Sequence, residues 1–371
     1  MSTSFDLEKF LVDVFDPVAG ERAAVVVDLP TPTVPDGPLW RERRLMAAAW
    51  RDGLDRLGRR IGFETPPLIG FPSNGVNGGD FPKDGEAGGR RIVMSDVLDR
   101  TSLVLAMTEY SMTAALVDVC KRRGGAEVFR AASMPGVQKW MEETSLAADY
   151  REVARRCRLL KAAFDNPDRV EVAFTTGHAC TFDIRHRLSE SDDGYLHRDK
   201  SDDIAVINLP SGETFSVPYE GERRGDPSRT EGELPVSEEG ETVVFRVKEN
   251  KIFEVQGSGP VARRYRDFFA TDAARANIAE VAFGCNERAK VTGNVLEEEK
   301  AGFHWAYGRS DHLGGVVGLA DFKAPETVVH QDIVYAKQSP ISVRSAVIVK
   351  STGQRIPVLD DREYVLFEEY R

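Results

Sequence analysis

Hydrophobic positions in the first 165 residues alternate between strand-like runs and helix-like periodicity. The β-branched run at 23–29 predicts a buried strand. From 39 to 61 apolar residues recur every three or four positions, which predicts an amphipathic helix. A second such helix is predicted over 146–164, ending before Asn166-Pro167. Further strands are expected at 68–71, 92–94 and 127–131, a helix at 112–121, and a strand or helix start at 102–107. This alternation predicts a parallel sheet flanked by helices.

After Pro167, short β runs separated by turn residues dominate the pattern. Strands are expected at 169–175, 180–186, 204–209, 241–247 and 251–255, with one helix at 258–269. We therefore predict an α/β domain over 1–167 and a β-rich α+β domain over 168–371. Two polar, Gly- or Pro-bearing stretches, 74–89 and 220–240, are expected to be loops. The first lacks a GxxxxGK[ST] or GxGxxG pattern and gives no nucleotide-binding signal.

Composition narrows the class of protein. The chain has 371 residues and a formal net charge of −11, which argues against binding to nucleic acid or to an anionic membrane. No secretion signal and no apolar run of about 18 residues is apparent. The four cysteines are far apart and form no CxxC pattern, so we expect reduced thiols. A soluble cytoplasmic protein is the expectation.

The most specific chemical pattern is His330-Gln331-Asp332 within an apolar strand-like run. Alternation along a strand places His330 and Asp332 on one face. An imidazole beside a carboxylate is half of a site for a divalent metal. An isolated HxD pattern more often makes an ordinary hydrogen bond, so it does not identify a metal site alone.

Three further residues are candidates for the same chemistry. Glu280 is the only charge in the run 278–284, His304 lies among apolar residues at 303–308, and Glu213 follows a tight turn. Simpler interpretations are an outward-facing glutamate, a core histidine and an exposed turn glutamate. The acids at 297–299 are expected to form a solvated helix face. Together, two Glu, two His and one Asp form a mixed nitrogen and oxygen set that suits zinc, manganese, cobalt or iron.

The order of these patterns resembles a known family. The chain carries, in this order, NLPSGE-x-F-x-x-P at 208–218, E-x-A-x-G-x-N at 280–286, TGN-x-LE-x-EK at 292–300, H-x-A-x-G at 304–308 and H-x-D at 330–332. This series is similar to the aminopeptidase T and aminopeptidase S type of thermophilic metallo-aminopeptidase, also called leucyl aminopeptidase.

The resemblance covers about residues 168–371 and implies an aminopeptidase T-like fold. It also implies a hydrolase that cleaves an N-terminal residue from a small peptide or related amide. The implied ligands of two divalent ions (zinc, cobalt or manganese) are Glu213, Glu280, His304, His330 and Asp332. Glu280 would bridge the ions and Glu213 would act as general base. A homodimer is implied as well.

One departure affects the expected chemistry. The family places a tyrosine seven residues after the histidine of HxAxG, where this chain has Asp311. The change implies an altered substrate or weak peptidase activity. Tyr307, Asp311 and His312 are therefore candidates for substrate contacts.

Two alternatives remain open. A related branch resembles non-haem Fe(II) dioxygenases that open dihydroxypyridine rings; it keeps HxD but has a histidine where this chain has Glu280. An Fe(II) triad of two histidines and one carboxylate is conceivable from His304, His330 and Asp332. The other alternative is a non-catalytic relative, against which the retention of five ligand-type residues counts.

Overall fold

The computed structural model describes residues 5–125, 127–199 and 205–368. By their internal contacts these residues form two compact units that interleave along the chain. The first lies within Met1–Ala154, Asp192–Ser211 and Asn286–Ala289, and the second within Arg155–Ser191, Gly212–Cys285 and Lys290–Arg371. Two short segments beyond residue 167 thus belong to the first unit. The division into domains at 167/168 stays a prediction.

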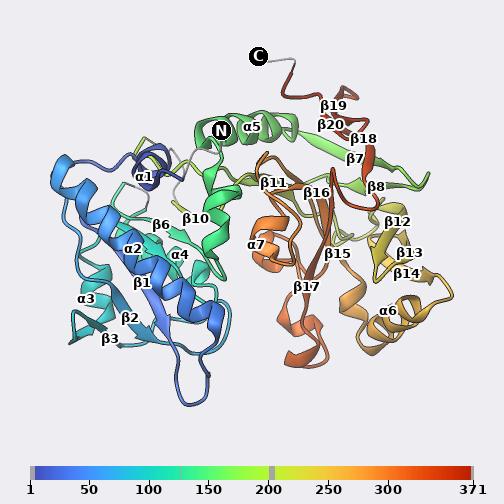
Figure 1. The fold of residues 1–371 in the computed structure, drawn as a ribbon. Coiled ribbons are helices and arrows are strands. Elements are labelled where there is room, and N and C mark those ends of the chain that lie inside the picture. The colour runs from blue at the N-terminus through green and yellow to red at the C-terminus, as the bar shows by residue number, and fades with distance from the viewer. Residues whose placement is uncertain (1–4, 126, 200–204, 369–371) are drawn as a thin grey trace. The chain divides into compact units, whose positions relative to one another are not determined.

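The first unit is built on a seven-stranded sheet with the order β10-β6-β5-β1-β2-β3-β4 (Figure 1). Its strands are β1 (Ala23–Leu29), β2 (Ile69–Pro72), β3 (Asp84–Ala87), β4 (Arg90–Val93), β5 (Leu103–Ala106), β6 (Arg130–Ser133) and β10 (Val206–Asn208). Neighbours from β10 to β2 pair in parallel, while β3 and β4 form an antiparallel hairpin at one edge. The helices are α1 (Leu7–Phe15), α2 (Pro38–Ile61), α3 (Met94–Leu98), α4 (Thr113–Arg123) and the start of α5 (Tyr150–Ala163).

The predicted parallel sheet and its helices are confirmed, with one correction. The stretch 74–89 is not a loop throughout, because β3 occupies its last part. The polar composition of Asp84–Ala87 concealed this strand; it is only partly buried and pairs across the Gly88-Gly89 turn, where both glycines have positive φ. Ile204, at the start of another predicted strand, lies outside the described residues.

The second unit contains two sheets. The five-stranded sheet has the order β17-β16-β15-β11-β9, and the eight-stranded sheet has the order β14-β13-β12-β8-β7-β18-β19-β20. Strands of the smaller sheet are β9 (Ser189–Asp192), β11 (Glu213–Ser216), β15 (Ile278–Gly284), β16 (Gly302–Gly308) and β17 (His330–Ala336). Those of the larger sheet are β7 (Pro167–Phe174), β8 (Ala179–Asp183), β12 (Glu231–Glu238), β13 (Glu241–Lys248), β14 (Lys251–Gln256), β18 (Val343–Lys350), β19 (Arg355–Asp360) and β20 (Glu363–Tyr364). The helices are α6 (Pro260–Thr271) and the short α7 (Val295–Glu298).

Aromatic side chains of β16 pack the smaller sheet against the larger one. The ring of Phe303 contacts Phe174 and Phe182, and the ring of Trp305 contacts Phe245. Because side chains alternate across a strand, this packing directs the odd-numbered residues of β16 into the core and the even-numbered ones, including His304, to the opposite face. The alternation therefore decides which face of the smaller sheet can carry polar chemistry.

The second half also holds a strand that the pattern did not reveal. The stretch 220–240 was expected to be a loop, but β12 occupies 231–238. Pro235 and Gly232 hid the alternation of the buried residues Leu234 and Val236. Gly232 has φ +136, and a Cβ there would lie 2.4 Å from the backbone oxygen of Ala179, so the close pairing with β8 requires glycine.

Candidate metal centre

Four neighbouring strands of the smaller sheet, β11, β15, β16 and β17, carry the ligand-type side chains. In the register, Glu280 on β15 is opposite Ala306 on β16, which is opposite Asp332 on β17. His330 is two residues before Asp332 and shares its face, as the sequence predicted. Glu213 begins β11, directly opposite Gly284 on β15. Figure 1 shows the strands β15, β16 and β17 that carry these residues.

The five side chains form two groups that share one carboxylate. Donor atoms of Glu213, Glu280 and His304 all lie within 4.8 Å of one another, and so do those of Glu280, His330 and Asp332. His304 Nε2 is 3.3 Å from Glu213 Oε2 and 3.6 Å from Glu280 Oε1. His330 Nε2 is 3.1 Å from Glu280 Oε2 and 3.7 Å from Asp332 Oδ1. Each oxygen of Glu280 thus faces a different histidine.

Burial excludes the simpler interpretations of these residues. Glu213 and Glu280 are only 5% and 6% exposed, and His304 is fully buried. Glu213 is therefore not an exposed turn residue, and Glu280 does not face outward. His304 is not an ordinary core histidine either, because its Nε2 and Glu213 Oε2 are buried without a hydrogen-bond partner among the described residues. Unsatisfied buried polar atoms are costly, so a group that pairs with both is favoured. A divalent cation fits them, since both are donor atoms that such an ion accepts.

Small residues make room for the cluster. Ala306 separates the carboxylates of Glu280 and Asp332 in the register, so no large side chain fills the space over that point. Gly284 permits a close backbone approach: a Cβ there would lie 2.3 Å from the carbonyl oxygen of Glu299. The segment that follows α7 is thereby brought against β15.

This approach delivers two ionisable residues that the sequence analysis did not assign to the site. Lys300 is fully buried, and its Nζ lies 2.5 Å from Glu213 Oε1 and 2.6 Å from Glu299 Oε1. The prediction that the acids at 297–299 form a solvated helix face is therefore wrong in part, because Glu297 is also fully buried. The sequence offers one signal for this contact: Lys300 is the single cation beside three acids in the EEEK run, shortly before the strand that carries HxAxG.

The charges of the cluster stabilise one another. Burial raises the pKa of Glu213, but the Lys300 ammonium and the His304 imidazole outweigh it and lower this pKa overall. Burial likewise raises the pKa of Glu280, but His304 and His330 outweigh it and lower this pKa overall. Burial lowers the pKa of each histidine, yet the neighbouring carboxylates raise it well above its usual value. In the absence of metal, the cluster thus favours charged histidines and carboxylates.

Glu299 behaves differently from the other carboxyl groups. Burial, together with the negative charges of Glu213 and Asp332, raises its pKa to about 8, although Lys300 opposes the shift. Glu299 therefore keeps a proton at neutral pH.

Backbone carbonyl groups orient both histidines. His304 Nδ1 is 3.2 Å from the oxygen of Gly302, and His330 Nδ1 is 2.7 Å from the oxygen of Arg309. Nδ1–H donation to a carbonyl leaves the Nε2 lone pair of a neutral imidazole directed at the carboxylates, which is the usual arrangement around a metal-binding histidine.

Comparison with known proteins shows a shared fold. No protein-family model and no curated protein matches the sequence. The structure is similar to 2,5-dihydroxypyridine dioxygenase from Pseudomonas putida, with a TM-score of 0.62 and 16% identity over 100% of this chain and 99% of the other. It is also similar to aminopeptidase T (AmpT) from Thermus thermophilus, with a TM-score of 0.55 and 13% identity over 97% and 98%. Both are enzymes. These identities show the fold, and the chemistry must be argued from the site.

The donor groups do not match an iron triad of two histidines and one carboxylate. Among the described residues, each group whose donor atoms lie within 4.8 Å of one another contains one histidine and two carboxylates. His304, His330 and Asp332 do not form such a group. Glu280 stands between the two histidines and contacts both.

The three candidate substrate residues occupy different positions. Tyr307 is on the face of β16 opposite His304, and its ring packs against Phe268 and Phe269 of α6. Asp311, at the family's tyrosine position, is held by Arg309 at 2.5 Å. The ring of His312 contacts that of His330 edge-on at 4.9 Å. Burial and the nearby His330 charge lower the pKa of His312 to about 4, so it is neutral at physiological pH. Of the three, His312 touches the cluster.

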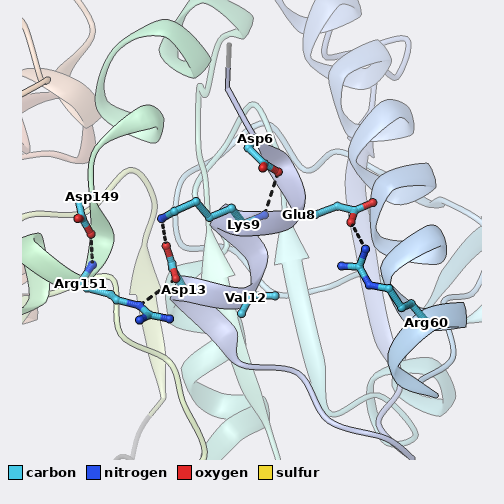
Figure 2. A pocket seen from close by; sticks show the side chains of 8 residues that line it. All are labelled: Asp6, Glu8, Lys9, Val12, Asp13, Arg60, Asp149 and Arg151. Atoms are coloured by element: carbon cyan, nitrogen blue, oxygen red, sulfur yellow. Dashed lines mark hydrogen bonds and ion pairs between the residues drawn. The ribbon is translucent and has the colours of Figure 1, made fainter. Parts of the chain in front are cut away.

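A pocket in the first unit lacks the histidine and carboxylate clusters of the second unit (Figure 2). Its three basic residues are paired: Lys9 with Asp13, Arg151 with Asp13 at 3.0 Å, and Arg60 with Glu8 at 2.8 Å, while Asp6 and Asp149 accept backbone N–H groups. No histidine or cysteine lines it. Paired surface charges of this kind contribute little energy and do not indicate a ligand.

Within the described residues, no helix is both long enough and apolar enough to span a membrane.

Proposed function

We propose that this protein is a metal-dependent hydrolase of the aminopeptidase type, which cleaves an N-terminal residue from a small peptide or a related amide. The observation that carries the proposal is the pair of three-residue groups that share Glu280. Two adjacent cation sites that share one carboxylate are the arrangement that two-metal hydrolases use. Zinc, cobalt and manganese all accept such ligands.

Each residue of the cluster has a distinct task in this proposal. Glu213 and His304 would hold one ion, His330 and Asp332 the other, and Glu280 both. When bound, such ions lower the pKa of a water molecule and polarise a carbonyl group. Lys300 fixes Glu213 through Oε1, which leaves Oε2 directed at His304.

The proton carrier is a choice between two carboxyl groups. The family resemblance favours Glu213, but its lowered pKa makes it a weak base. Glu299, whose pKa is about 8, holds a proton near neutral pH and can therefore give one to the leaving amine. We therefore include Glu299 as a candidate general acid and keep Glu213 as the candidate general base. Glu299→Gln and Glu213→Gln separate their tasks: loss of turnover with metal affinity retained identifies a proton carrier, whereas a ligand substitution also weakens metal binding.

A second candidate is an Fe(II) dioxygenase, which the higher TM-score to the dihydroxypyridine dioxygenase favours. The composition of the donor groups counts against it, because neither group contains two histidines. We rank it below the hydrolase for that reason.

One paired assay tests the ranking. Metal-free protein is incubated with aminoacyl anilides plus Zn²⁺, Co²⁺ or Mn²⁺, and separately with Fe²⁺ and a dihydroxylated pyridine while oxygen is monitored. We expect metal-dependent amide cleavage that Glu280→Gln abolishes and that the exposed-surface control Glu254→Gln leaves intact. Oxygen consumption without amide cleavage would reverse the ranking. Absence of both activities, with no metal bound, would favour a non-catalytic relative.

A further inference from the structure

A groove follows the outer edge of β17, the strand that carries His330 and Asp332. It encloses about 540 Å³ and reaches from Gln331 and Asp332 to Ile341. Its lining includes Tyr265 and Phe268 of α6, Glu298 of α7 and the nearby Val291. The groove thus begins at a proposed metal ligand and leads away from it along the strand.

Backbone groups of β17 face this groove. β17 is the last strand of its sheet and pairs only with β16. The Asp332 carbonyl accepts a hydrogen bond from the side chain of Gln331 at 3.2 Å. The Ala336 N–H donates to Ser339 Oγ at 3.1 Å, and the Ala336 carbonyl accepts from the Ser339 N–H at 3.0 Å. These groups thus point away from the ladder with β16, and those of Ala336 are already paired. Because alternate residues of an antiparallel strand point their backbone groups the same way, those of Val334 face the groove as well.

We propose that this groove binds the peptide substrate as an added strand on β17. The inference rests on the proposed aminopeptidase function and names how its substrate is held. An exposed strand edge offers main-chain hydrogen bonds to any extended peptide, whatever its side chains. The ligand residue Asp332 fixes the direction: the substrate N-terminus lies beside Asp332, and the peptide runs toward Ala336, parallel to β17.

The open part of the edge limits how much of a peptide it reads. Ala336 is 1% exposed and bonded to Ser339, so the open edge runs from Asp332 to Val334, two residue steps or about 7 Å at ~3.3 Å per residue. Contacts should therefore increase up to about three substrate residues and then stop. The groove lining mixes aromatic and aliphatic side chains with Glu238, Arg264 and Glu298.

A peptide series tests this with the unmodified, metal-loaded protein. Substrates of two to eight residues are compared with otherwise identical peptides N-methylated at one amide between the second and fourth residues. We expect KM to fall with length up to about three residues and to rise about two- to tenfold on methylation of an amide that bonds the edge, as loss of one net hydrogen bond predicts, with little change in kcat. A KM that is independent of both length and methylation overturns the groove and leaves the hydrolase proposal intact.

A proline substitution tests the protein side. Val334→Pro removes an N–H that faces the groove while the neighbouring bonds to β16 remain, and proline is tolerated at sheet edges for this reason. We expect KM for a five-residue peptide to rise about two- to tenfold but KM for an aminoacyl anilide to stay near that of the matched control Val334→Ala. Equal effects on both substrates contradict the proposal.

Two further measurements separate the possible failures. Direct titration of the five-residue peptide and its methylated analogue by calorimetry reports binding without turnover. Methylation-sensitive binding without cleavage supports the groove and removes the hydrolase function. Sedimentation of Val334→Pro and Val334→Ala tests a different occupant: a proline-specific loss of a dimer, with no peptide binding to the unmodified protein, would assign this edge to a second copy of the chain and overturn the proposal.

Discussion

The two units each contain a buried cluster of charged residues, but the clusters differ in whether their atoms are satisfied. In the first unit, the guanidinium of Arg130 binds Glu21 at 2.6 Å and also donates to the backbone oxygens of Phe15 and Leu196. Glu21 is bound additionally by Arg198 at 2.8 Å. In the second unit, Glu213 Oε2 and His304 Nε2 face each other without a hydrogen bond.

This difference separates a structural ion pair from the proposed ligand site. A buried charge is tolerated when its partners are fixed, as around Arg130. The second cluster concentrates three carboxylates and two histidines with donor atoms left over. Burial alone thus does not identify a site; in the second unit the unpaired atoms of Glu213 and His304 also converge with the donor atoms of Glu280.

The largest expected effect comes from the shared carboxylate. Glu280→Gln keeps the shape of the side chain but removes a ligand from both groups, so metal affinity should fall at least about 100-fold and turnover should be lost with it. Titration of the metal-free variant with Zn²⁺ measures the affinity, and circular dichroism checks the fold. Unchanged affinity in Glu280→Gln would remove this residue from the site and leave the two clusters equivalent.

A pair of lysine and arginine substitutions compares the clusters directly. Lys300→Met and Arg130→Met each remove one partner of a buried ion pair and should destabilise the metal-free protein by about 3–5 kcal/mol. Saturating Zn²⁺ should recover part of the loss in Lys300→Met, because a bound cation replaces the missing positive charge beside Glu213. Zn²⁺ should recover none of the stability that Arg130→Met loses relative to the unmodified protein under the same conditions. Equal recovery, measured by chemical denaturation with and without Zn²⁺, would contradict the distinction.

The pH dependence of stability should also distinguish the clusters. His304 and His330, with raised pKa values, bind protons that the unfolded chain releases above about pH 6.5. Their contribution is complete below that pH and is lost as pH rises through the folded pKa values. Glu299 acts in the same direction, since its pKa is raised to about 8. The free energy of unfolding of the metal-free protein should therefore decrease between pH 6 and 9.

The cluster around Glu21 acts only in the acid range, where the lowered pKa values of Glu213 and Glu280 contribute as well. Burial raises the pKa of Glu21, but Arg130 and Arg198 outweigh it and lower this pKa overall. Its stabilisation is present above the unfolded pKa and is lost as pH falls through the folded one. Denaturation curves of metal-free protein from pH 3 to 9 test both limbs. A rise in stability from pH 6 to 9 would contradict the assignment of charged histidines.

The pattern of residues predicted part of this centre because strand alternation is a local rule. It placed His330 and Asp332 on one face, and the family resemblance supplied Glu213, Glu280 and His304. Lys300 and Glu299 were missed because their entry depends on a long-range event, the approach of their backbone to Gly284. The same applies to β12, whose proline and glycine suggest a turn unless its partner strands are known.

The smallest expected effect concerns Asp311, at the position where the family has a tyrosine. Its carboxylate is partly exposed and already paired with Arg309, and such pairs are worth about 0–1 kcal/mol. Asp311→Asn should change stability by less than that amount and leave metal affinity unchanged. A loss of metal affinity, measured by the same Zn²⁺ titration, would extend the cluster beyond the five proposed ligands.

The most direct test of the central claim is a crystal structure of the Zn²⁺-loaded protein with anomalous scattering recorded on both sides of the zinc edge. We predict two peaks, one beside Glu213 and His304 and one beside His330 and Asp332, with Glu280 between them. A single peak bound by His304, His330 and Asp332 without Glu280, or no peak at these residues, would contradict the account.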